Sequence, residues 1–266
     1  MTPLYDTHCH LDAPEFDDDR EVVWSRARAV GVTCALIPAV EPSSWPKTLA
    51  CALPGERVAA LGVHPQYLPR LTESAIDDAM ASLEATIRRA GDAVVAVGEC
   101  GFDAWRDDTR GQTTLQRRVF AAHAAVARAL ELPLVVHVLK AHGEALAAMR
   151  SVSLPRRPGV IHSYSGSAEL VTEYVSLGWH LAVGGSVTRP GARRPVEALR
   201  RIPADRLLLE TDAPDQVPSG VVAGVRRCEP SHLSIIATRA AALRGEDVDV
   251  MAARCTATAR GLFRRG

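Results

Sequence analysis

The sequence lacks an excess of charge of either sign, since Lys and Arg together number 31 and Asp and Glu also number 31. A neutral chain does not attract nucleic acid or acidic membranes through its overall field, so a partner of either kind has to use a local patch. No apolar run reaches the roughly 18 residues that span a membrane. The N-terminus has no basic stretch followed by an apolar run. We therefore expect no membrane span and a cytoplasmic location.

Cysteine pairs, linkers, low-complexity segments and internal repeats are absent as well. The six cysteines include no Cys-x-x-Cys pair, and several lie within apolar runs. This pattern favours free thiols in a reducing compartment over a disulfide framework. Residues 1–266 are expected to form one domain, and the lack of an apolar interface stripe favours a monomer.

Short apolar segments alternate with segments of helical periodicity along the chain. Strands are predicted at Leu4–Thr7, Val32–Pro38, Val58–Val63, Ala93–Gly98, Leu132–Val138, Gly159–His162, Trp179–Val183 and Leu207–Glu210. Helices are predicted at Ser74–Arg89, Thr114–Leu130, Ala168–Leu177, Pro195–Arg201, Glu229–Leu243 and Asp247–Phe263. The strands are apolar throughout, which is typical of parallel strands covered on both faces. The pattern predicts an α/β fold of the (β/α)8 TIM-barrel type, with an open doubly wound sheet as the competing arrangement.

Six residues with metal-ligand side chains stand at the C-terminal ends of five predicted strands: His8, His10, Glu99, His137, His162 and Asp212. In a barrel these ends gather at one rim, where active sites of this fold lie. His8 and His10 are two residues apart, so both imidazoles share one face of a strand. A single such histidine is more often structural, but six candidates in a chain with nine histidines favour a metal site.

The candidate ligands suit two divalent ions. A carboxylate such as Glu99 can bridge two ions with its two oxygens, and Asp212 would face the water between them. The mixture of imidazole and carboxylate favours Zn, Mn, Co, Ni or Fe, with Mg still possible. Asp6 and Glu210 either orient ligating histidines or form structural caps and pairs.

Six motifs follow one another along nearly the whole chain: Asp6–Asp12, Gly62–Pro65, Val97–Asp103, Leu132–His137, His162–Gly166 and Leu208–Pro214. In this order they resemble the TatD-type metal-dependent deoxyribonucleases, which belong to the wider amidohydrolase-like barrels. Residues 183–186 and 211–215 look most like the bacterial branch typified by the YjjV proteins. The resemblance implies a (β/α)8 barrel, two and sometimes three divalent ions, and hydrolysis of phosphodiester bonds by activated water.

The resemblance also implies residue roles. It places the six candidates named above in the family's ligand positions and places His64 beside the substrate phosphate. We expect a deoxyribonuclease with 3'-5' exonuclease-like action on DNA, in which Asp212 accepts a proton from water and Glu99 and His64 complete the catalytic set.

Two departures from the family pattern lie where substrate is expected. Relatives often carry Arg two residues after the fifth-strand histidine, whereas this chain has Leu139 there, followed by Lys140. Lys140 either replaces that cation or is a solvated lysine. Relatives also carry Arg-Asn before Glu-Pro in the last loop, where this chain has Arg227 and Cys228. The predicted substrate contacts are His64, Lys140, Tyr164 and Arg227.

Aromatic side chains in the predicted rim loops offer a second kind of substrate contact. Tyr164, Trp105 and Tyr67 either stack on a base or pack within their loops. His123 within a predicted helix is expected to be structural, whereas the role of His142 is open.

Two other functions are open at this point. The same barrel and ions can hydrolyse an amide, a lactone or a carboxylic ester, including the ester of an aminoacyl-tRNA, because the fold does not fix the bond that is cleaved. A non-catalytic metal-binding protein is the remaining alternative, but such a protein is expected to have lost some ligand residues.

Overall fold

The computed structural model describes residues 2–221 and 224–264. One sheet has the strand order β1 to β8, and each neighbouring pair is parallel. The strands are β1 (Leu4–Asp6), β2 (Val32–Pro38), β3 (Arg57–Leu61), β4 (Val94–Asp103), β5 (Leu134–Leu139), β6 (Gly159–Ile161), β7 (His180–Val183) and β8 (Leu207–Leu209). The Thr7 N–H donates to the Leu209 carbonyl at 3.1 Å, so the ends of β1 and β8 meet. The predicted (β/α)8 barrel is confirmed.

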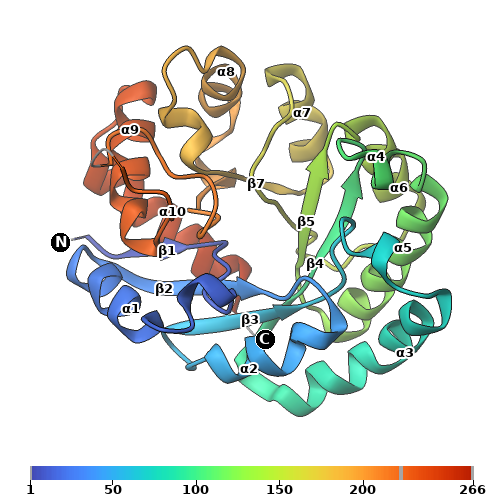
Figure 1. Ribbon diagram of the computed structural model, residues 1–266. Coiled ribbons are helices and arrows are strands. Elements are labelled where there is room, and N and C mark those ends of the chain that lie inside the picture. Colours follow the sequence, from blue (N-terminus) through green and yellow to red (C-terminus); the bar gives the residue numbers. More distant parts are fainter. Residues whose placement is uncertain (1, 222–223, 265–266) are drawn as a thin grey trace.

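Helices surround the sheet on its outer face (Figure 1). They are α1 (Arg20–Ala29), α2 (Trp45–Cys51), α3 (Glu73–Ala90), α4 (Asp107–Arg110), α5 (Thr113–Leu130), α6 (His142–Ser151), α7 (Ala168–Ser176), α8 (Arg193–Arg201), α9 (Leu233–Arg244) and α10 (Val248–Leu262). The sequence analysis did not predict α1, α2, α4 or α6; of these, α2 and α4 have seven and four residues and are too short to show a helical period. Within the described ranges, no helix combines the length and apolarity needed to cross a membrane.

Strand β4 is longer than the prediction of Ala93–Gly98, which was wrong at its end. The strand continues through Glu99 to Asp103 and stays paired with β5. Glycines permit this close pairing, because a Cβ at Gly98 would lie 2.4 Å from the Val135 carbonyl oxygen and one at Gly101 would lie 2.1 Å from that of His137. Glu99 therefore lies within a strand, and Asp103 ends it.

Apolar side chains cover both faces of the sheet, as the strand composition predicts. The barrel interior is filled by a cluster with members from every strand: Tyr5, Leu36, Ala60, Val95, Ala96, Val135, Val160, Ala182 and Leu208. A larger cluster lies between the strands and the helices and includes Trp24, Phe120, Tyr174 and Trp179. This packing fixes the strand ends that carry the candidate ligands.

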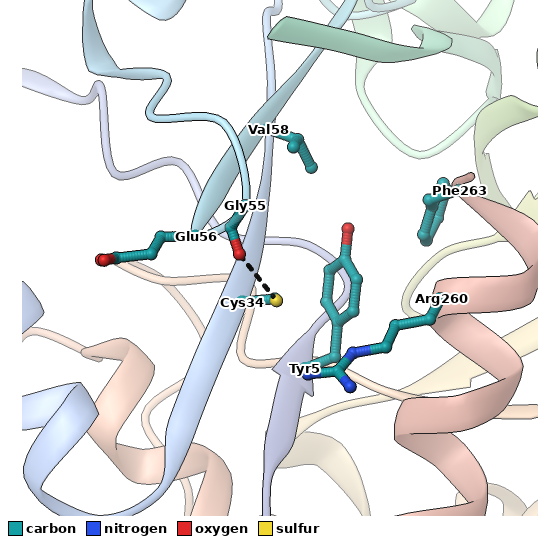
Figure 2. A pocket seen from close by; sticks show the side chains of 7 residues that line it. All are labelled: Tyr5, Cys34, Gly55, Glu56, Val58, Arg260 and Phe263. Atoms are coloured by element: carbon teal, nitrogen blue, oxygen red, sulfur yellow. Dashed lines mark hydrogen bonds between the residues drawn. The ribbon is translucent and has the colours of Figure 1, made fainter. Parts of the chain in front are cut away.

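The N-terminal end of the barrel is covered by the end of α10, where Phe263 lies 5.9 Å from Tyr5 between ring centroids. A hollow of about 260 Å³ lies beside these rings (Figure 2). It is lined by Tyr5, Cys34, Gly55, Glu56, Val58, Arg260 and Phe263. None of the predicted ligand residues lines this hollow, so it is separate from the site described next.

Candidate metal centre

The six predicted ligand residues come together at the C-terminal ends of the strands. His8 and His10 follow β1, Glu99 lies in β4, and His137 lies in β5. His162 directly follows β6, and Asp212 follows β8. Their side-chain atoms form overlapping groups close enough to hold metal ions, with Glu99 common to two of these groups. The convergence expected of strand ends in a barrel is therefore present, whereas the metal-binding roles stay a prediction.

The first group, called site A, consists of His8, His10, Asp212 and Oε2 of Glu99. His8 Nε2 lies 3.2 Å from both His10 Nε2 and Glu99 Oε2. Asp212 Oδ1 lies 3.6 Å from each of these two histidine nitrogens. Ligand atoms at about 2.1 Å from a tetrahedral ion are about 3.4 Å from one another. The spacing in site A therefore fits one ion with four ligands.

The second group, called site B, consists of His137, His162 and Oε1 of Glu99. His162 Nε2 lies 2.8 Å from Glu99 Oε1, and His137 Nδ1 lies 3.5 Å from the same oxygen. The two histidine nitrogens are 3.2 Å apart. Three ligands leave a position for water or substrate, which is the arrangement of catalytic rather than structural sites.

Glu99 connects the two sites. Its side chain is 1% exposed, and both carboxylate oxygens face imidazole nitrogens: His8 Nε2 lies 3.2 Å from Oε2, and His162 Nε2 lies 2.8 Å from Oε1. Burial alone would raise the pKa of Glu99, but the interaction of the carboxylate with the surrounding histidines, His162 foremost, outweighs burial and holds the pKa well below its usual range. A buried carboxylate needs a compensating positive charge or hydrogen-bond donors close by. The two oxygens of Glu99 could each hold a metal ion together with the neighbouring imidazoles.

Oxygen atoms on the far side of three histidine rings orient them toward the two sites, through hydrogen bonds to His10 and His137 and a longer contact to His162. His10 Nδ1 lies 3.1 Å from the Pro38 carbonyl oxygen, and His137 Nε2 lies 3.0 Å from Asp103 Oδ2. His162 Nδ1 faces Glu210 Oε1 at 3.6 Å. An oxygen acceptor on the far side holds the ring proton there, so the site-facing nitrogen keeps its lone pair for a metal.

His64 has the opposite arrangement. Its Nδ1 accepts a hydrogen bond from the Gln66 N–H at 3.1 Å. Burial lowers the pKa of His64 to about 4, so the ring is neutral at pH 7 and carries its proton on Nε2. This Nε2 lies 3.0 Å from Glu99 Oε1. A protonated nitrogen donates a hydrogen bond and does not ligate a metal, which favours the predicted role beside a phosphate over a ligand role.

Asp212 is held by a residue that the sequence analysis missed. Gln216 Nε2 donates to Asp212 Oδ2 and also to Ser163 Oγ. Because Gln216 occupies Oδ2, Oδ1 is the oxygen turned toward His8 and His10. The position of Gln216, four residues beyond Asp212 in an irregular loop, gave no periodic signal in the sequence.

Asp103 is the second missed residue. Its side chain is 1% exposed and lies at the end of β4. Oδ2 accepts hydrogen bonds from His137 Nε2 and Gln66 Nε2, and Oδ1 accepts one from the Trp105 N–H. Burial would raise the pKa of Asp103, but the hydrogen bonds from His137 and Gln66 lower it below its usual value. Its place in the Val97–Asp103 motif was the available signal.

Replacing Asp103 by Asn is expected to weaken metal binding at site B by about 10- to 100-fold. The neutral amide attracts the His137 N–H less strongly, and loss of a residue that orients a ligand has effects of this size. Calorimetric titration with Mn or Zn measures the change. Asp108→Asn, in the exposed helix α4, is the matched control. Equal metal affinity in Asp103→Asn and the parent protein would contradict the assignment.

Metal affinity is expected to increase with pH. Burial lowers the pKa of His162, but the nearby carboxylates of Glu99 and Glu210 raise it by more than burial lowers it. The pKa of His162 is therefore well above its ordinary value. A metal has to displace this proton, so binding is weaker at about pH 6 than at about pH 8. The folding stability of the metal-free protein is expected to change in the opposite direction and to decrease as pH rises. The stabilisation from protonated His162 is complete below the pKa of the unfolded state and is lost as pH rises through the raised pKa of the folded state. Thermal unfolding with metal and with chelator at several pH values tests both statements.

The predicted substrate contact at Tyr164 has to be corrected. Tyr164 is 3% exposed, and its hydroxyl donates to the Ser167 carbonyl oxygen at 2.8 Å. Its ring packs against His142 and Tyr174. His142 hydrogen-bonds to the Tyr174 hydroxyl at 2.9 Å, so it belongs to the same buried cluster. These rings are part of the packing around α6 and α7 and do not offer a surface to a base.

Arg227 also has a structural place. Its guanidinium donates to both carboxylate oxygens of Asp19 and to Glu229 Oε1, and it lies 4.7 Å from the centre of the Phe16 ring. These contacts tie the last loop to the segment before α1, and contact of Arg227 with substrate stays a prediction. Cys228 is fully buried, so the change from the family's Asn lies inside the packing.

His123 has a structural role, and Lys140 lies at the rim where a substrate contact was predicted. His123 is buried and accepts a hydrogen bond from the Val63 N–H at 3.0 Å, which is a structural role as predicted. Lys140 is exposed at the rim, and its Nζ lies 5.5 Å from the centre of the Trp105 ring. Its contact with substrate stays a prediction.

Comparison with known proteins agrees with this geometry. The family model described as TatD related DNase matches residues 5–264. The chain is 36% identical to a Pantoea ananatis protein named 3'-5' ssDNA/RNA exonuclease TatD, over 98% of this chain and 99% of the relative. It is 35% identical to the Escherichia coli K12 protein named uncharacterized metal-dependent hydrolase YjjV, over 81% of each chain. The crystal structure of that YjjV, a TatD homologue, superposes with a TM-score of 0.88, at 32% identity and over 98% of this chain and 97% of the other. The chain therefore belongs to the TatD related DNase family.

Proposed function

We propose that this protein is a metal-dependent phosphodiesterase that removes nucleotides from the 3' end of single-stranded DNA or RNA. The observation that carries the proposal is Glu99, a buried carboxylate with a lowered pKa whose Oε2 faces His8 and His10 and whose Oε1 faces His137 and His162. The name of the Pantoea ananatis relative supports the substrate class and the direction of cleavage.

In the proposed enzyme, sites A and B each hold one divalent ion. Imidazole with carboxylate suits Zn, Mn, Co or Ni, and Mg fits less well. When bound, such ions polarise a phosphoryl oxygen and make a nearby water more acidic.

The protein's own residues have separate tasks in this mechanism. Asp212 accepts the proton of the attacking water, while Gln216 holds Oδ2 and fixes the orientation of the carboxylate. The Nε2–H of His64 donates a hydrogen bond to a nonbridging oxygen of the phosphodiester. The water oxygen forms a bond to phosphorus, the bond from phosphorus to the 3' oxygen of the preceding nucleotide breaks, and that oxygen takes up a proton from solvent.

Cleavage of an end-labelled single-stranded oligonucleotide tests the proposal. With a 5' label and added Mn or Mg, a ladder of shortened products is expected, whereas a 3' label should appear only in the smallest products. Chelator and Asp212→Asn should each remove the ladder. Absence of cleavage with every metal would overturn the nuclease proposal and direct attention to lactone, amide and carboxylic ester substrates.

A further inference from the structure

Trp105 is an exposed tryptophan at the rim that carries the candidate metal centre. Its side chain is 58% exposed, whereas the other three tryptophans of the chain are at most 6% exposed. Exposed aromatic residues of this size are typical of binding surfaces, because an indole left in water loses the stabilisation of burial. Trp105 lies two residues beyond the end of β4.

The backbone that carries Trp105 is held by Asp103. Asp103 Oδ1 accepts hydrogen bonds from the Trp105 N–H and from Thr109 Oγ1, both at 2.9 Å. Its other oxygen holds His137 of site B. One buried carboxylate therefore positions both a predicted ligand and the turn that presents the indole, which fixes the ring's attachment relative to the site.

Lys140 places a positive charge over one face of this ring and leaves the opposite face to a base. Its Nζ is 5.5 Å from the ring centre, and it lies three residues beyond His137, which is at most roughly 10 Å of extended chain. No ion pair joins Lys140 to a carboxylate within the described ranges of the chain. A flat aromatic face next to an uncompensated cation matches a nucleotide, whose base stacks and whose phosphate pairs with the cation.

We propose that Trp105 and Lys140 form the binding site for a nucleotide next to the phosphodiester that is cleaved. Trp105 stacks on its base without regard to sequence, and Lys140 binds its backbone phosphate. This inference rests on the proposed nuclease function. Stacking on Trp105 would let the enzyme distinguish nucleic acid from a phosphodiester that has no bases.

An abasic substrate isolates the contribution of stacking. The KM of the parent enzyme for an oligonucleotide is expected to be about tenfold lower than for the same oligonucleotide with its last three nucleotides abasic. In Trp105→Ala this ratio should fall toward one, whereas Trp105→Phe should keep most of it. Leu53→Ala, a 45% exposed apolar residue just before β3 and so at the opposite end of the barrel, is the matched control. A ratio that is the same in Trp105→Ala and the parent enzyme would overturn the proposal.

Fluorescence separates this inference from the proposed activity. Because Trp105 is the exposed tryptophan, binding of the oligonucleotide to metal-loaded Asp212→Asn protein should quench emission, and the abasic oligonucleotide should quench it less. Lys140→Gln should make the affinity less sensitive to salt. The negative slope of log affinity against log salt should become smaller in magnitude by about 0.7, as expected for the loss of one phosphate contact. Quenching without hydrolysis by the parent enzyme would reject the nuclease proposal and keep the binding site. Equal quenching by the two oligonucleotides, or none, would reject the binding site.

Discussion

Replacing Glu99 by Gln is expected to remove metal from both sites at once and to reduce turnover to background. The carboxylate contributes one oxygen to each site, 3.2 Å from His8 Nε2 and 2.8 Å from His162 Nε2. An amide has one oxygen and no charge, so it cannot serve both sites. Changes outside the ligand shell already reduce metal affinity 10- to 100-fold, so we expect a loss above about 100-fold at each site. Metal content after dialysis, together with calorimetric titration, measures it.

A control is needed to show that the loss is local. Glu56→Gln changes a carboxylate at the opposite end of the barrel, beside the hollow of Figure 2, and should keep both ions. Circular dichroism should show that Glu99→Gln is folded, because glutamine can hydrogen-bond to the surrounding imidazoles. A Glu99→Gln protein that still binds two ions with the parent's affinity would exclude the bridging role.

Replacing Asp212 by Asn is expected to lower kcat by roughly 10²- to 10⁴-fold while the protein stays folded. The amide oxygen can still lie near His8 and His10, but it cannot accept a proton from water, and loss of a general base has effects of this size. Steady-state cleavage of a labelled oligonucleotide at saturating metal measures kcat. The metal has to be saturating because Asp212 also belongs to site A, and weaker metal binding in the variant would otherwise lower the rate as well.

Asp205→Asn is the matched control for this experiment. Asp205 precedes β8 and Asp212 follows it, so the two carboxylates lie at opposite ends of one strand. Asp205 is 79% exposed and should be replaceable without loss of turnover. Near-parental kcat in Asp212→Asn would reject this residue as the base, and an equal loss in both variants would indicate a general structural effect.

The barrel and its candidate ligands were predictable because each depends on a local pattern. Buried parallel strands are apolar along their whole length, and a polar residue at the end of such a strand is visible in the sequence. The barrel topology then places these ends together without further information. Glu99 and His137 were found in this way although neither strand end was predicted correctly.

The missed role of Asp103 and the contacts of Tyr164 and Arg227 depend on partners that only the folded chain brings together. Asp103 was not assigned a role because β4 was expected to end at Gly98, and its continuation depends on pairing with β5. Tyr164 was expected to face substrate because it lies in a loop, but α7 contributes Tyr174, against which its ring packs. Arg227 was matched to a family position, yet Asp19, 208 residues earlier, binds its guanidinium.

The double attachment of Asp103 has a consequence for how such an enzyme can diversify. The turn that carries Trp105 is anchored by the same carboxylate that orients His137. Exchange of this turn during evolution or loop grafting therefore acts on the metal as well as on the substrate. New specificities should arise more easily by changing Trp105 itself than by changing the length of the turn, and successful grafts should retain the aspartate at its start.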